Sequence, residues 1–322
     1  MSTLVTGGAG FIGSHFVDLL LGIRPDEPVT VLDSLTYAGH RDNVAPHRED
    51  PRFTFVRGDV ADAGAVDPLV KAADVVVNFA AESFVDRSIA DARPFAVTNV
   101  VGTQTLLDAC LRHGVPMVQV STDEVYGSIR DGAFTEDSPL APNNPYAATK
   151  AGADLLCRSF HRTHGLDVRI MRGANAYGPR QHPEKAIPTF TAAALRGEPL
   201  PVYGDGSNRR EWLHAEDFAR AVLTVLERGE PGEVYNAGGG HEVANLELAR
   251  AICRLAGAPE SLVTFVEDRP GHDFRYSMVW ERLASVGWKP EVAFEDGLSR
   301  TVSWFREHPE RRAAAAATGG PR

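Results

Sequence analysis

Glycines at fixed spacing follow an apolar run at the start of the chain, and they constrain the fold more than any other feature. Residues 2–8 lead into Gly7-Gly8-Ala9-Gly10-Phe11-Ile12-Gly13, which satisfies both G-x-x-G-x-x-G and G-x-G-x-x-G. Glycine lets a backbone turn tightly and approach a pyrophosphate, and the N–H groups of a following helix attract that group. We therefore predict a dinucleotide site that uses Gly7, Gly10, Phe11, Ile12 and Gly13. The alternative is a purely structural turn.

Acidic residues at the ends of the next two apolar runs indicate which dinucleotide is bound. Asp33 closes the run 28–33, where its carboxylate can accept hydrogen bonds from ribose hydroxyls and would repel a 2′-phosphate. Residues 34–38 contain no arginine that could bind such a phosphate, so NAD is favoured over NADP. Asp59, which ends the third run, Val60 directly after it, and Ala80, near the end of the fourth run, are further predicted cofactor contacts. Asp59 could equally cap its strand.

Apolar runs alternate with helical stretches through the first half of the chain. Runs with little polar alternation are typical of strands buried on both faces, and strand–helix alternation predicts right-handed βαβ units. The expected strands are 2–8, 28–33, 53–59, 73–81, 115–122 and 166–173, and the expected helices are 13–22, 63–72, 97–113 and 146–164. The predicted fold class is α/β, a Rossmann-type doubly wound parallel sheet with a smaller, mixed C-terminal substrate-binding domain.

The composition changes near residue 173, where proline and glycine become denser. We predict an NAD-binding part at 1–172, to which 210–238 returns through a helix over 212–229 and a following strand. The substrate-binding part would then comprise 173–209 and 239–312. Residues 313–322 show no apolar periodicity and are predicted to form a disordered tail.

Charge and cysteine content exclude several classes of function. A net charge of −10 makes nucleic acid and anionic membrane surfaces poor partners, and the sequence shows neither a signal segment nor a membrane-spanning apolar run. Three widely spaced cysteines without a C-x-x-C pair argue against disulfides and against a metal site. We expect a cytoplasmic protein with buried thiols and no metal.

Polar residues that could carry chemistry follow the expected strand 115–122. Ser121-Thr122-Asp123-Glu124 lies at its carboxyl end, where ligands of open α/β sheets bind. Tyr146 and Lys150 are spaced i, i+4 and so share one face of a helix. Lys150 could lower the pKa of the Tyr146 phenol and bind the nicotinamide ribose, so that Tyr146 takes a proton from a sugar hydroxyl as hydride leaves. A solvated turn or a helix cap is the alternative for Asp123 and Glu124.

Motifs along nearly the whole chain resemble the extended short-chain dehydrogenases/reductases, most closely the dTDP-glucose 4,6-dehydratase family. These include TGGAGFIGSHF, LDSLTYAG, NFAAESFVDRSI, STDEVYGS, PYAATKAGAD, YGPRQHPEKAIP and DRPGHDFRYS. The Asp-Glu pair after the threonine of STDEVYG is the most telling piece, since related epimerases lack it. The resemblance implies an NAD-dependent enzyme acting on a small nucleotide-sugar substrate, a homodimer joined through 97–113 and 146–164, and no nucleic-acid or membrane partner.

The resemblance also implies a role for each catalytic candidate. Oxidation at C4 of the hexose would acidify the C5 hydrogen and so permit loss of water across C5 and C6, with hydride finally returned to C6. Tyr146, helped by Thr122, would act on the C4 hydroxyl, Glu124 would be the base at C5, and Asp123 the acid for the C6 hydroxyl. Two alternatives remain open: a nucleotide-sugar 4-epimerase on the same scaffold, and a non-catalytic NAD-sensing protein.

Substrate contacts are likewise assigned through the resemblance. Arg210 matches the family's pyrophosphate arginine, and Tyr203 matches an aromatic residue that stacks on the base or else packs on the core. The remaining candidates are Ser83, Asn175, Lys185, His272 and Tyr276. Phe84 and Ala176 depart from the family pattern, each replacing a polar side chain beside the expected sugar pocket. These departures leave open which hexose and which nucleotide are used.

Overall fold

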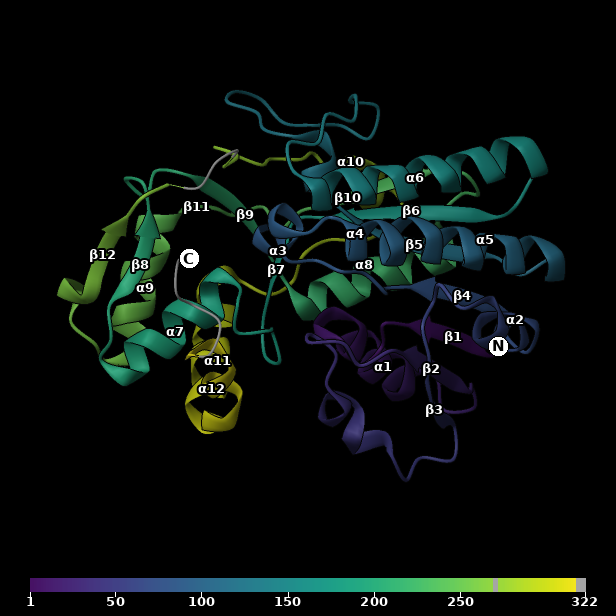
Figure 1. Cartoon of the computed structure of the whole chain (residues 1–322), viewed down its shortest axis with the longest axis horizontal. Coiled ribbons are helices and arrows are strands. Elements are labelled where there is room, and N and C mark those ends of the chain that lie inside the picture. The colour runs from purple at the N-terminus through teal and green to yellow at the C-terminus, as the bar shows by residue number, and fades with distance from the viewer. Residues whose placement is uncertain (269–271, 317–322) are drawn as a thin grey trace.

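Seven parallel strands form the main sheet of the protein. The computed structural model describes residues 1–268 and 272–316 (Figure 1). The strand order is β10-β6-β5-β4-β1-β2-β3, and every neighbouring pair is parallel. The strands are β1 (Thr3–Thr6), β2 (Val29–Asp33), β3 (Phe53–Arg57), β4 (Val75–Asn78), β5 (Met117–Thr122), β6 (Val168–Gly173) and β10 (Val234–Ala237).

The order of the strands reverses between β1 and β4. The chain runs outward from β1 through β2 to β3, and then crosses to pair β4 on the other side of β1. Strands β1, β4 and β5 are buried along their whole length, as expected for apolar runs covered on both faces. Ligands of such sheets bind beyond the carboxyl ends of the strands at the reversal, which places the glycine turn after β1 at the centre of any site.

Helices cover both faces of this sheet (Figure 1). On one face α1 (Phe11–Ile23) lies beside α8 (Ala215–Arg228), and Phe16 and Phe218 belong to one hydrophobic core. On the other face Leu106 and Cys157 belong to a second core. The helices of that face are α2 (Ala63–Lys71), α5 (Gly102–His113) and α6 (Pro145–His164), and the short α3 (Val85–Ala90), α4 (Arg93–Phe95) and a π-helical turn (Ala96–Val101) precede α5.

A smaller part with two short sheets lies beside the carboxyl ends of the main strands (Figure 1). Its strands are β7 (Asn175–Tyr177), β9 (Arg209–His214) and β11 (Glu242–Ala244) in one sheet, and β8 (Leu200–Tyr203) and β12 (Val263–Val266) in the other. Its helices are α7 (Ala186–Arg196), α9 (Asn245–Ala256), α11 (Phe294–Glu307) and α12 (Pro309–Ala316). The short α10 (Glu281–Ser285) packs instead against β10 and α8 of the main part. A third hydrophobic core, which includes Ile187, Leu248 and Leu298, fills this part.

The predicted fold class is confirmed, but two local expectations are wrong. Residues 212–214, expected to begin a helix, are the end of β9, which pairs with β7 and β11. Residues 313–316, expected to be disordered, belong to α12, because alanine favours helix even without an apolar stripe. The rest of that expected tail, 317–322, lies outside the described residues. Within the described ranges, the helices are too short or too polar to cross a membrane.

Candidate active site

The glycine turn between β1 and α1 has room for backbone only. Gly7 has a φ of 68°, and a Cβ there would lie 2.6 Å from the backbone nitrogen of Ala80, which follows β4. A Cβ at Gly13 would lie 2.3 Å from the carbonyl oxygen of Gly7. Gly10 is the N-cap of α1, so Phe11 and Ile12 form its first turn. This cradle brings N–H groups and a helix N-terminus to one place, as a pyrophosphate requires.

Polar contacts fix the peptide of Ala9 inside this turn from both sides. Its N–H donates to Asp33 Oδ2 at 2.9 Å, and its carbonyl accepts from Asn43 Nδ2 at 2.9 Å and from the backbone N–H of His40 at 3.0 Å. Asp33 Oδ1 accepts from the N–H of Leu35 at 2.8 Å. Burial raises the pKa of Asp33 and these N–H donors oppose that effect. The carboxylate stands at the end of β2, where a ribose would lie.

Two further predicted cofactor residues flank the turn. Asp59 Oδ1 accepts from the N–H of Ala61 at 2.9 Å, so it serves as the local cap that the sequence had left as an alternative. One Asx contact leaves its other oxygen able to accept a hydrogen bond. Val60 is buried and packs against Gly102 of α5. A Cβ at Gly102 would lie only 2.6 Å from the Val60 side chain.

The carboxyl end of β5 carries the predicted catalytic turn. Thr122 Oγ1 donates to Asp123 Oδ1 at 3.0 Å and accepts from the N–H of Glu124 at 3.3 Å, which holds the three residues in a short 3₁₀ turn (Asp123–Tyr126). Asp123 is 2% exposed and Glu124 is 8% exposed. Glu124 Oε2 accepts from Asn144 Nδ2 at 3.3 Å. A surface cap pair would lie in solvent, so the burial argues against that alternative.

The two carboxyl groups of this turn occupy different environments. Burial, and then the charge of Glu124, raise the pKa of Asp123 well above its ordinary value. Of the two carboxyl groups, Asp123 is therefore the one whose surroundings favour the protonated form, as a general acid requires. Glu124 acts as an acceptor in its contact with Asn144, as a general base must.

Helix α6 brings Tyr146 and Lys150 to this turn. Both are buried, and Lys150 Nζ donates to the carbonyl of Val120 on β5 at 2.7 Å. Burial and the charge of Glu124 raise the pKa of Tyr146 well above its ordinary value, while a hydrogen bond with Thr122 lowers it. The expected lowering of the Tyr146 pKa by Lys150 does not appear among these effects, and burial also lowers the pKa of Lys150 itself.

Several buried polar atoms around these side chains have no hydrogen-bond partner among the described residues. They include Ser121 Oγ, Asp123 Oδ2 and Asn175 Oδ1. Buried polar atoms are normally paired, so such a group of orphans at the strand ends fits a polar ligand that supplies hydroxyls or amides. The described residues contain no group of three or more His, Cys, Asp and Glu side chains that could hold a metal.

The predicted substrate arginine lies close to the catalytic turn and is firmly oriented. Arg210 is 7% exposed, and its guanidinium donates to the carbonyl of Asp273 at 2.8 Å and lies 4.5 Å from the centre of the Tyr276 ring. Tyr276 donates to Asp273 Oδ2 at 2.5 Å, and the charge of Glu124 contributes to raising its pKa after burial. Arg210, Tyr276 and Glu124 therefore face one region.

Four of the other five substrate candidates, all except Asn175, form two pairs. Lys185, at the start of α7, donates to the carbonyl of Ser83 at 2.8 Å and lies 5.6 Å from the centre of the Phe84 ring. The departure at Phe84 thus places an aromatic face beside a lysine next to the expected sugar pocket. Tyr203 and His272 pack edge to face, with ring centres 5.9 Å apart.

Comparison with known proteins identifies the family. The model of the GDP-mannose 4,6 dehydratase family matches residues 4–301. The chain is 52% identical over 313 residues to a dTDP-glucose 4,6-dehydratase of Actinoplanes sp., which covers 95% of this chain and 98% of the relative. The chain belongs to the dTDP-glucose 4,6-dehydratase family of extended short-chain dehydrogenases/reductases.

Two other known proteins are similar to nearly the whole chain. The low-salt glycan biosynthesis protein Agl12 of Haloferax volcanii is 57% identical over 306 residues, covering 95% of this chain and 98% of the relative. The crystal structure of DesIV, a dTDP-glucose 4,6-dehydratase of Streptomyces venezuelae with NAD and TYD bound, is 55% identical. It covers 96% of this chain and 98% of that chain, with a TM-score of 0.94.

The structure adds residues to this dehydratase-family site that sequence reasoning missed. Asn144 contacts Glu124 and caps α6 through the N–H of Ala147 at 2.9 Å, and Asp273 accepts from Asn143 at 2.6 Å. The position of Asn144, directly before the proline that begins α6, is a cap signal that could have indicated it. Asp273 offers no such local signal, because its partner Asn143 is 130 residues away.

Proposed function

We propose that the chain catalyses the NAD-dependent 4,6-dehydration of a nucleotide-activated hexose, with dTDP-glucose as the expected substrate and the 4-keto-6-deoxy sugar as product. The observation that carries the proposal is the buried Asp123–Glu124 pair, in which burial raises the pKa of Asp123 and Glu124 accepts a hydrogen bond from Asn144. Elimination of water needs one base and one acid close together, and this pair offers both.

Each step of the reaction has a residue suited to it. Tyr146, hydrogen-bonded with Thr122, removes the proton of the C4 hydroxyl. Glu124 removes the C5 proton, and Asp123 gives its proton to the departing C6 hydroxyl. NAD⁺, when bound, accepts hydride from C4 and supplies it to C6, so the cofactor is unchanged after a full turnover. The positive nicotinamide would also counter the burial that raises the pKa of Tyr146.

The residues proposed to hold the two ligands lie on the two sides of the catalytic turn. The glycine turn (Gly7, Gly10, Phe11, Ile12, Gly13), the strand ends (Asp33, Asp59, Val60, Ala80) and the helix pair Tyr146 and Lys150 would hold NAD. The substrate would contact Ser83, Asn175, Lys185, Tyr203, Arg210, His272 and Tyr276. The proposed division assigns 1–172 and 210–238 to cofactor binding and 173–209 and 239–312 to substrate binding, although β9 shares its hydrogen bonds with β7 and β11.

The test is to separate C4 oxidation from C5 proton removal. In deuterated water, the Glu124→Gln variant should lose solvent exchange at C5 and slow overall turnover about 10²–10⁴-fold, while C4 oxidation stays measurable. Glu295→Gln, an exposed carboxylate of α11, is the matched control and should exchange as the wild type does. Exchange at C5 in the Glu124 variant would show that another group is the base.

A panel of dTDP-, UDP-, GDP- and CDP-hexoses identifies the substrate. The hexose that loses 18 mass units on incubation with the enzyme is the one that is dehydrated.

A nucleotide-sugar 4-epimerase is the competing function. Epimerisation needs C4 oxidation and reduction only, and so leaves Asp123 and Glu124 without a task. A product of unchanged mass and inverted C4 would favour the epimerase and overturn the proposal.

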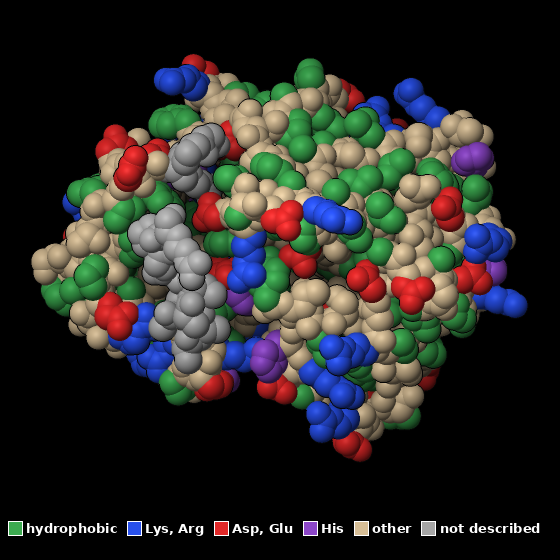
Figure 2. Space-filling model, viewed as in Figure 1, with side chains coloured by type: hydrophobic (Ala, Val, Ile, Leu, Met, Phe, Trp, Pro, Cys, Tyr) green, Lys and Arg blue, Asp and Glu red, His purple; other side chains and the backbone are tan. Residues whose placement is uncertain are grey.

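We further propose that the chain is a cytoplasmic homodimer. Helix α6, the π-helical turn and α5 expose Leu155, Val97, Val101 and Leu111, which are 54%, 41%, 47% and 37% exposed. Figure 2 shows hydrophobic side chains gathered where Figure 1 places these helices. Leu155→Glu should shift the sedimentation coefficient to that of a monomer, whereas Phe265→Glu, on the distant β12, should not.

The three cysteines are buried free thiols in the described part of the chain, as suits a reducing compartment.

A further inference from the structure

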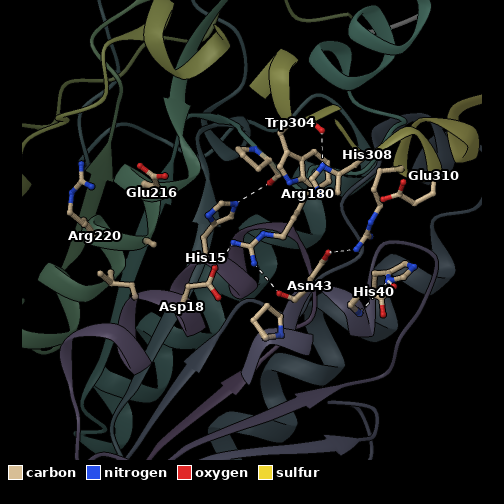
Figure 3. Close-up of a pocket in the computed structure, with 16 residues that line it drawn as sticks. His15, Asp18, His40, Asn43, Arg180, Glu216, Arg220, Trp304, His308 and Glu310 are labelled. Carbon is tan, nitrogen blue, oxygen red and sulfur yellow. Dashed lines mark hydrogen bonds and ion pairs between the residues drawn. The ribbon is translucent and has the colours of Figure 1, made fainter. Parts of the chain in front are cut away.

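A cavity of about 880 Å³ lies where the C-terminal helices meet the cofactor part (Figure 3). Its walls come from α1, the 3₁₀ turn Arg41–His47, the segment after β7, the start of α8, and helices α11 and α12. None of the five proposed catalytic residues lines it. One of the residues that line it, Asn43, also contacts the glycine turn.

Asn43 is the centre of these contacts. Its side chain is 2% exposed, and its Nδ2 donates to the carbonyl of Ala9 within the glycine turn at 2.9 Å. Its own carbonyl accepts from Arg180 Nη1 at 2.9 Å, and its Oδ1 accepts from Arg311 Nη2 at 3.1 Å. Figure 3 shows the guanidinium of Arg180 directed at the backbone carbonyl of Asn43. Arg180 and Arg311 are 137 and 268 residues away from Asn43 along the chain, so these bonds join segments that are far apart in the sequence.

Arg180 is held in an uncommon backbone conformation. Its φ is 68°, one of two positive values at non-glycine positions in the described chain. A residue with a Cβ rarely adopts such a conformation, so the surrounding contacts must stabilise it. Its Nη2 donates to Asp18 Oδ2 on α1 at 2.5 Å, and Asp18 also contacts His47 at 2.6 Å. One guanidinium therefore holds both α1 and Asn43.

We propose that Arg180 and Arg311 are positioning residues that hold Asn43, and through it the Ala9 peptide, so that NAD stays bound between turnovers. The inference rests on the proposed function, in which the cofactor is regenerated in every turnover and has no need to leave. Contacts that hold the glycine turn in one conformation would slow the release of NAD from such an enzyme. Arg180 and Arg311 both follow β7 in the chain. NAD retention would therefore depend on the folding of the smaller part.

The experiment measures how fast NAD leaves the purified holoenzyme, by chasing with excess isotope-labelled NAD and quantifying the bound nucleotide by mass spectrometry. Arg180→Gly removes the guanidinium and suits a φ of 68°, so it tests the contact without added backbone strain. Loss of two hydrogen bonds should speed NAD release about tenfold. Arg311→Ala, which loses one bond from a helix surface, should speed release a few-fold. Arg306→Ala is the matched control, because its bond to the Leu255 carbonyl stays within the smaller part.

Two additional readouts separate positioning from general destabilisation. The Asn43→Ala and Arg180→Gly changes should together cost less than the sum of their separate effects, since both act through one contact. The KM for the sugar nucleotide with NAD saturating should stay within twofold of the wild type. Release rates of Arg180→Gly and Arg311→Ala within twofold of the wild type would overturn the inference. A wild-type chain that binds no NAD would instead overturn the proposed function.

Discussion

The cofactor side and the substrate side of the site are built in different ways. On the cofactor side, the glycine turn and Asp33 lie within one βαβ unit, and Ala9 and Asp33 are 24 residues apart. On the substrate side, Lys185 reaches Ser83 across 102 residues, and Arg210 reaches Asp273 across 63. Backbone and local order build the glycine turn itself, and the distant side chains of Arg180 and Arg311 reach it only through Asn43. Side chains from distant segments build the substrate side directly. NAD affinity should therefore be most sensitive to backbone changes in the turn, and substrate affinity to changes of single side chains.

The largest effect is expected from Gly7→Ala. A Cβ at this position meets the Ala80 backbone at 2.6 Å in a conformation that disfavours any side chain, so the turn must move. We expect NAD affinity to fall at least about 100-fold, measured by isothermal titration of the apoprotein.

Gly22→Ala, at the far end of α1, is the control for Gly7→Ala. Among the described residues nothing lies within 4 Å of a Cβ at Gly22. The alanine should leave NAD affinity unchanged and stabilise the helix by about 0.5–1 kcal/mol. Equal NAD affinity in the two glycine variants would mean that backbone approach does not define the cofactor side.

The second effect tests a buried ion pair that contacts the catalytic turn, between the two sides. Arg172 on β6 donates to Asp154 of α6 at 2.8 Å and to the hydroxyl of Tyr126 in the catalytic turn at 2.8 Å. Arg172 and Asp154 are fully buried. Arg172→Met leaves the Asp154 charge unpaired and should lower the free energy of unfolding by about 3–5 kcal/mol, as measured by urea denaturation.

The double variant Asp154→Leu with Arg172→Met shows whether this pair serves stability or position. Removal of both charges should restore most of the lost stability. If turnover stays low in the restored protein, the pair positions the catalytic turn against α6. Full recovery of turnover would show that the pair only stabilises the fold.

The third effect concerns the substrate side and compares neighbouring arginines. Arg210→Lys loses the planar guanidinium that is oriented by the carbonyls of residues 209, 273 and 274. We expect the KM for the sugar nucleotide to rise about 10–100-fold, with NAD affinity unchanged. Arg209→Lys, a partly exposed side chain near Glu242, should change KM less than twofold. A loss of NAD affinity in Arg210→Lys would contradict the separation of the two sides.

The sequence predicted the parts of the fold that depend on local patterns and missed contacts that join distant segments. Strand burial, glycine spacing and the i, i+4 pair of Tyr146 and Lys150 are local patterns, and local patterns can be recognised in one sequence. The end of β9 was wrongly expected to be helical, because its strand state depends on pairing with β7 and β11. Asn43 offered no signal, since two of its partners lie 137 and 268 residues away.

The smallest effect is expected at the joint between the two sides, where His15 Nε2 of α1 lies 3.0 Å from the carbonyl oxygen of Pro179. Burial, and then the charge of Arg180, lower the pKa of His15 from 6.5 to about 3. Between these values the unfolded chain binds a proton that the folded chain does not, so stability is present above pH 6.5 and falls as the pH drops. The loss from His15 between pH 7 and pH 5.5 should be about 1 kcal/mol.

The His15→Gln variant isolates this term, because its amide can donate to the Pro179 carbonyl and does not titrate. Urea denaturation at pH 7 and pH 5.5 should show the wild type losing about 1 kcal/mol more than the variant. If both proteins lose the same amount, His15 is protonated in the folded state. The joint would then be open to water, and α1 and the segment after β7 would be coupled more weakly than the contacts of Arg180 and Asn43 indicate.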